Sequence, residues 1–83
     1  MRKLKVYGGN EFYRLESGLK QLRTIIATTS QKEVARIMNI SLYEVKTYWA
    51  ETGNDGELSV ALLNPGVAYV RIKGVYMRAD CVA

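Results

Sequence analysis

The sequence contains no histidine, a single cysteine and a single proline among its 83 residues. The absence of histidine excludes proton transfer and metal binding through imidazole. Cys81 has no second cysteine to pair with, and one cysteine without histidine makes no zinc site of the usual kinds. The carboxylates are scattered, and no glycine-rich nucleotide motif is present. An enzyme is therefore the least expected class, and we expect no cofactor and no metal.

Long hydrophobic runs are also missing, and none approaches the roughly 20 residues that a membrane span needs. The first residues are charged but no apolar signal segment follows them. Together with the lone cysteine, this predicts a cytoplasmic protein that does not contact a membrane. Residues 1–83 are the length of one domain with a small core, so we also expect a homo-oligomer, in which association buries more apolar surface.

Strand patterns are found near both ends of the chain. Residues 3–7 alternate between polar and apolar, and Gly8, Gly9 and Asn10 predict the end of that strand. Residues 11–21 are expected to form a loop or an irregular hairpin arm. Residues 22–28 predict a second strand, antiparallel to the first. Residues 67–73 predict another strand, and residues 75–78 an additional edge strand.

Helix signals fill the middle. Ser30 and Ser41 are each followed three residues later by glutamate, which is the capping box that starts a helix. Asn39 is suited to end the first helix in the left-handed conformation. Asn54 or Asp55 is expected to cap a third short helix. The sequence thus predicts an α+β fold of order β-β-α-α-α-β, with a possible final strand. Two to three helices would pack on one face of an antiparallel sheet of three or four strands.

Two surfaces are candidates for binding. If the strands align, one sheet face combines cations with tyrosines, which bind phosphates and stack on bases. The alternative is an ordinary solvated face. The second candidate is the turn after the second helix, where a large aromatic residue stands beside a polar glycine turn. Here the alternative is that Trp49 belongs to the core and that the polar residues cap the next helix. The candidate residues are Lys5, Tyr7, Arg23, Tyr69 and Arg71 on the sheet, and Tyr48, Trp49, Thr52 and Asn54 at the turn.

Residues 31–50 resemble the Q-x-x-V-A-x-x-x-x-I-S-x-x-x-V pattern of helix-turn-helix repressors. The resemblance implies a DNA-binding regulator whose second helix contacts DNA through Ser41, Tyr43, Lys46 and Thr47. Charge disfavours this interpretation, because residues 26–64 carry a net charge of −2 while residues 1–25 carry +4. Since Lys and Arg supply most non-specific DNA affinity, DNA is a partner only under this alternative.

The segments K-L-K-V-Y-G, E-T-G-N and N-P-G-V, at residues 3–8, 51–54 and 64–67, resemble a group of small phage-encoded accessory proteins without an assigned function. The resemblance implies a non-enzymatic binding protein in the bacterial host cytoplasm. It further implies an antagonist of antiviral defence that sequesters a nucleotide signal or blocks a nucleic-acid or protein component of the defence system. A nucleotide-type small molecule or a host defence protein is thus the expected partner.

Overall fold

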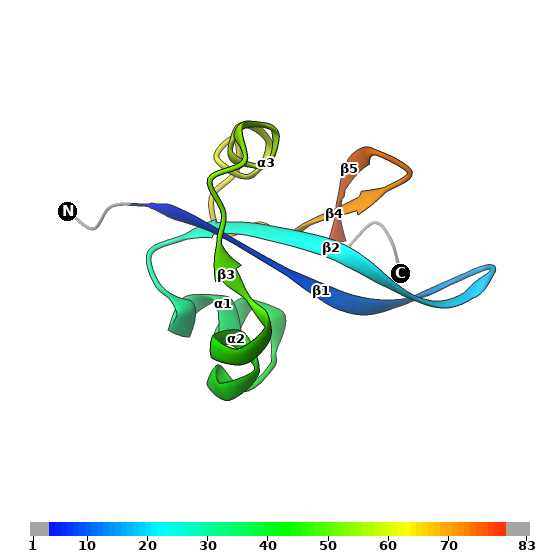
Figure 1. Ribbon diagram of the computed structural model, residues 1–83, viewed down its shortest axis with the longest axis horizontal. Helices are drawn as coiled ribbons and strands as arrows, with labels where there is room; N and C mark the ends of the chain where they lie inside the picture. Colours follow the sequence, from blue (N-terminus) through cyan, green and yellow to red (C-terminus); the bar gives the residue numbers. More distant parts are fainter. Residues whose placement is uncertain (1–3, 80–83) are drawn as a thin grey trace.

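A single antiparallel sheet runs through the computed structural model, which describes residues 4–79. The strand order in the sheet is β3-β1-β2-β4-β5, and the three helices of the described part lie against it (Figure 1). The α+β class is confirmed, but the sheet has five strands instead of three or four, and the predicted order of elements is wrong because a short strand, β3, lies between the second and third helices. The elements are β1 (Lys5–Leu15), β2 (Gly18–Thr28), α1 (Gln31–Met38), α2 (Leu42–Tyr48), β3 (Ala50–Glu51), α3 (Asp55–Ala61), β4 (Tyr69–Ile72) and β5 (Val75–Arg78).

The hairpin of β1 and β2 is the longest feature of the fold. The two strands pair over their whole length, from Lys5 opposite Thr28 to Leu15 opposite Gly18. The predicted antiparallel pairing is confirmed. Of the two alternatives expected for residues 11–21, the loop is wrong and the hairpin arm is confirmed, but the arm is regular because these residues continue both strands. In Figure 1 the far half of the hairpin extends away from the helices, in a molecule measuring 42 × 27 × 18 Å. We call residues 10–23 the arm.

Gly8 and Gly9 lie inside β1, so the prediction that they end the strand is wrong. Their lack of a side chain serves packing from both faces of the sheet. A Cβ on Gly9 would lie 2.6 Å from ring atoms of Trp49, and one on Gly8 would collide with the guanidinium of Arg23. Glycine inside a strand here marks a close approach by another group.

Helices cover both faces of the sheet, so the prediction that they pack on one face is wrong (Figure 1). Tyr7 and Ile26 pack against α1 and α2, on what we call the helix-pair face. Their neighbours Val6 and Ile25 pack with Ala61 of α3, on the α3 face. Because successive strand residues point to opposite faces, two adjacent apolar residues give a strand two faces to bury.

The predicted helix ends are confirmed. Ser30 Oγ accepts a hydrogen bond from the Glu33 backbone N–H at 3.3 Å, and Ser41 Oγ accepts one from that of Glu44 at 3.1 Å. Asn39 ends α1 with a φ of 57°. Of the two caps considered for the third helix, Asn54 is the one observed.

The C-terminal strands form a second, short hairpin. The predicted bounds of β5 are confirmed, but β4 is shorter than the predicted strand at both ends. It begins only at Tyr69, and it ends at Ile72 because Lys73 and Gly74 form the turn, with φ of 51° and 82°. None of the helices in residues 4–79 combines the length and apolarity that crossing a bilayer requires.

Candidate functional site

The predicted face of cations and tyrosines does not form. The pairing register divides its members between the two faces of the sheet, and both tyrosines are buried. The prediction that these residues share a face is therefore wrong, because strand register and parity decide which side chains meet. Lys5 and Tyr7 belong to the helix-pair face, whereas Arg23, Tyr69 and Arg71 belong to the α3 face.

Trp49 belongs to the core and is only 3% exposed. Its ring lies over Gly9, and its indole Nε1–H donates to Glu11 Oε1 at 3.0 Å. This contact ties the end of α2 to β1. The preceding residue, Tyr48, is 70% exposed, so only Tyr48 of this aromatic pair is open to a ligand. The helix-turn-helix candidates on α2 all lie at the surface; they are Ser41, Tyr43, Lys46 and Thr47.

Four of the predicted residues do gather, around Glu57 on α3. Arg23 donates to both carboxylate oxygens of Glu57, from Nε at 2.8 Å and from Nη2 at 3.1 Å. Thr52 Oγ1 donates to Oε1 at 2.7 Å, and the Asn54 side chain accepts from the Glu57 backbone N–H. The hydrogen bonds from Arg23, more than any other contact, hold the pKa of Glu57 below its usual value, and nearby Arg71 adds to this.

Glu57 is 5% exposed, and the bonds from Arg23 and Thr52 already engage both of its oxygens. The cluster therefore attaches α3 to the sheet, and we assign it a structural role. The sequence interpretation did not select Glu57, although its position three residues after a capping asparagine was a signal for its backbone contact.

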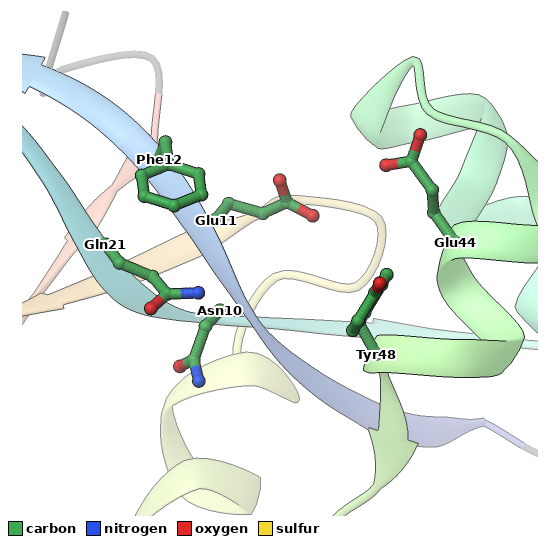
Figure 2. A pocket seen from close by; sticks show the side chains of 6 residues that line it. All are labelled: Asn10, Glu11, Phe12, Gln21, Glu44 and Tyr48. Atoms are coloured by element: carbon green, nitrogen blue, oxygen red, sulfur yellow. The ribbon is translucent and has the colours of Figure 1, made fainter.

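Two grooves flank the arm, one at the edge of each strand. The acidic groove lies between β1 and α2 and has a volume of about 430 Å³. The basic groove lies between β2 and the β4–β5 turn and has a volume of about 980 Å³. The acidic groove is lined by Asn10, Glu11, Phe12, Gln21, Glu44 and Tyr48 (Figure 2). The basic groove is lined by Arg14, Leu15, Glu16, Ser17, Lys20, Leu22, Ile72 and Lys73.

The basic groove exists because β4 separates from β2. The two strands pair only at Thr24 with Val70 and at Ile25 with Tyr69. Beyond these pairs the β4–β5 hairpin rises away from the arm (Figure 1). Leu22 and Ile72, which would otherwise meet as neighbours, form the apolar part of the groove lining together with Leu15.

Three cations and one carboxylate give the basic groove its charge. Arg14, Lys20 and Lys73 are exposed, and within residues 4–79 none of them forms an ion pair. By contrast, Lys5, Arg23 and Arg36 are each paired with a glutamate. Guanidinium and ammonium groups bind phosphate oxygens by charge-assisted hydrogen bonds, so this groove suits an anion that also has an apolar or ring portion.

Sequence reasoning did not combine these three cations. A signal for them was present in the sequence, because Arg14 and Lys20 lie on either side of the turn-forming residues Ser17 and Gly18, and Lys73-Gly74 lies between two strand patterns. Had residues 11–21 been predicted as two regular strands joined by a tight turn, Arg14 and Lys20 would have been placed near that turn.

Comparison of the chain with models of protein families, with curated proteins and with solved structures gave no match. The described residues contain no group of three or more potential metal ligands among Cys, Asp and Glu side chains. A proposal for the function therefore rests on the side chains that line the two grooves.

Proposed function

We propose that the protein is a non-enzymatic binding protein of phage type that captures a phosphate-bearing ligand in the basic groove. In a bacterial host cytoplasm, such capture would antagonise antiviral defence by sequestering a nucleotide signal or by blocking a nucleic-acid or protein component. The observation that supports this proposal is that one groove is lined by three cations, Arg14, Lys20 and Lys73. None of them forms an ion pair in the described part of the chain.

The lining combines what a nucleotide requires. Cationic side chains from both hairpins are placed to bind phosphate, and Leu22 and Ile72 offer an apolar surface to a base. The volume of about 980 Å³ lies at the upper end of the range for small-molecule sites, about 300 to 1,000 Å³. Glu16 weakens the positive potential but leaves an excess of two cations.

Calorimetric titration tests the proposal. Cyclic nucleotides, ADP-ribose and inorganic phosphate would be titrated into the wild type and into the variant Lys20→Ala/Lys73→Ala. We expect a nucleotide to bind and the double substitution to weaken it by about tenfold or more, since about 1.4 kcal/mol corresponds to tenfold. The matched control Lys32→Ala/Lys46→Ala removes two exposed lysines outside the groove and should leave affinity unchanged. Titrations without heat for all ligands would reject phosphate capture.

A second candidate is the helix-turn-helix regulator, favoured by the exposed outer surface of α2. Ser41, Tyr43 and Lys46 are all open to solvent, while Val45 and Trp49 hold the helix against the sheet. This function predicts salt-dependent retardation of duplex DNA, weakened by Lys46→Glu. Absence of retardation at low salt would exclude it.

Self-association is a further part of the proposal. Large apolar side chains such as Leu63 and Val75 are mostly exposed in the single chain, and a second copy would bury them. We expect a mass above that of one chain in light scattering at high protein concentration.

A further inference from the structure

The outer edge of β1 is uncovered along the arm. On this side β3 pairs with β1 only at Tyr7 and Gly8, and within the described part of the chain no strand continues the pairing. The Thr52 backbone N–H donates to the Val6 carbonyl at 2.8 Å, so Val6 directs its backbone groups away from β2. Because this direction alternates along a strand, Asn10, Phe12 and Arg14 also direct their N–H and C=O groups outward. The edge therefore offers a row of donors and acceptors to an added strand.

The acidic groove lies along this edge. The chain joins this edge at β3 directly after α2 ends at Tyr48, so α2 lies beside the edge and forms the opposite wall of the groove. Figure 2 shows the carboxylates of Glu11 and Glu44 pointing into the space between β1 and α2. The bond from Trp49 Nε1 fixes Glu11, and neither carboxylate forms an ion pair with another described residue. With two carboxylates and no cation in its lining, the groove repels phosphate and attracts a positive charge.

Two aromatic rings complete the groove. Phe12 is 64% exposed and Tyr48 is 70% exposed, an unusual degree for rings of this size. Their faces can pack on an aliphatic stem, and a cation near a ring face gains further attraction. The side chains of Glu11 and Phe12 point to opposite faces of the sheet, so an added strand would meet the carboxylates on one face and the Phe12 ring on the other.

We propose that the acidic groove binds an extended basic segment of a partner protein, which adds to the edge of β1 as a further strand. Backbone hydrogen bonds to Phe12 and its outward-directed neighbours hold the segment. A Lys or Arg side chain lies between Glu11 and Glu44, and apolar side chains at alternate positions pack on Phe12. The site is independent of phosphate capture in the basic groove, because it is lined by different residues and has the opposite charge.

Peptides of known sequence test the proposal on the full chain. The probe is a fluorescently labelled, capped hexapeptide of alternating lysine and valine, with binding followed by fluorescence anisotropy. One comparison peptide replaces valine by proline, which keeps the charge but removes backbone donors. Another replaces lysine by glutamate. We expect the lysine–valine peptide to bind, the proline peptide to bind at least tenfold more weakly, and the glutamate peptide not to bind.

Two variants test whether the peptide binds in the acidic groove. Glu11→Gln/Glu44→Gln should weaken the lysine–valine peptide about tenfold or more, and the glutamine at position 11 still accepts a hydrogen bond from Trp49. The matched variant Glu16→Gln/Asp55→Asn makes the same change in net charge at exposed positions outside the acidic groove and should bind as the wild type does.

Amide hydrogen exchange on the wild-type protein gives an independent readout. In the free protein, the amides of Phe12 and Arg14 should exchange faster than that of Tyr13, which points to β2. The peptide should slow exchange at Phe12 and Arg14 and leave Tyr13 unchanged.

Equal affinity for the proline and valine peptides would overturn strand addition, and equal affinity of the two double variants would overturn the groove assignment. A protein that is already dimeric, with Phe12 and Arg14 protected without peptide, would show that a second copy occupies the edge and would overturn the proposal as well.

Discussion

The two grooves differ in charge and chemistry, although the same arm forms one wall of each. β3 covers β1 as far as Gly8, and β4 covers β2 at Ile25 and Thr24. Gly8 and Ile25 are partners in the hairpin, so both edges become uncovered at the same level. What fills the space beyond differs, because α2 brings a carboxylate to one edge and the β4–β5 turn brings a lysine to the other. A single hairpin can thus present two separate sites when its covering elements are short.

The two grooves also differ in the elements that form and hold their walls. The wall of the acidic groove is a helix attached to the sheet through Trp49, whereas both walls of the basic groove are strands. A substitution at the helix attachment should therefore damage one groove and spare the other.

The largest effect is expected for Trp49→Ala. Removal of this buried ring leaves a cavity over Gly9 and takes away the bond to Glu11, at a cost of about 4 kcal/mol in the free energy of unfolding. Urea unfolding followed by circular dichroism measures the loss. Among the molecules that remain folded, the lysine–valine peptide should no longer bind, while the ligand of the basic groove still binds. A loss below about 1 kcal/mol, or equal damage to both grooves, would contradict this division of support.

Gly9→Ala acts on the same attachment from the other side. The added methyl group meets the Trp49 ring at 2.6 Å, and a rigid ring between sheet and helices moves less easily than a flexible side chain. We expect a loss of about 3 kcal/mol, at the upper end for overpacking. Gly53→Ala is the matched control, because a methyl group at Gly53 meets no atom within 4 Å. Similar losses in the two variants would mean that a general cost of replacing glycine by alanine, and not contact with Trp49, sets the loss.

Gly9 also illustrates which features of the fold could not be predicted from the sequence. The helix caps and the left-handed Asn39 were predictable because they depend on hydrogen bonds between residues at most five positions apart. The glycines were interpreted as a turn because the side chains that cover them, Arg23 over Gly8 and Trp49 over Gly9, are distant in the sequence. Once the strand was ended at Gly8, the regular pairing along the arm and the two grooves beside it could not be predicted.

Prediction of the candidate site likewise required contacts between residues that are far apart in the sequence. A two-residue strand such as β3 leaves no periodic pattern, yet the bond from Thr52, which follows it, shows which backbone groups of β1 point outward. The face of each side chain follows from the register, so cations on different strands, such as Lys5 and Arg23, are divided between the two faces.

A smaller, pH-dependent effect is expected for Glu57→Gln, which alters the α3 face outside both groove linings. At pH 7 we expect a loss of about 2 kcal/mol, the range for a hydrogen bond to a charged group, because Arg23 loses its carboxylate partner. The pKa of Glu57 is lower in the folded protein than in the unfolded chain. Its contribution is therefore fully present above the unfolded value of about 4.3 and is lost as the pH falls through the folded pKa.

Urea unfolding of wild type and Glu57→Gln at pH 7 and pH 3 measures this difference. The two proteins should approach equal stability at the lower pH, and both ligands should bind Glu57→Gln at pH 7 as they bind the wild type. A difference in stability that does not change with pH would show that the carboxylate charge contributes nothing.

The smallest effects on stability are expected for the groove charges themselves. Lys20→Ala/Lys73→Ala and Glu11→Gln/Glu44→Gln should each change the free energy of unfolding by less than about 0.5 kcal/mol, as is usual for surface positions. None of these four side chains forms an ion pair within residues 4–79, and the glutamine at position 11 keeps the bond from Trp49. Each double variant should nevertheless lose its own ligand and retain the other. Charges that bind ligands without stabilising the fold would distinguish the grooves from the Arg23–Glu57 pair, where charge stabilises the fold and is not available to a ligand.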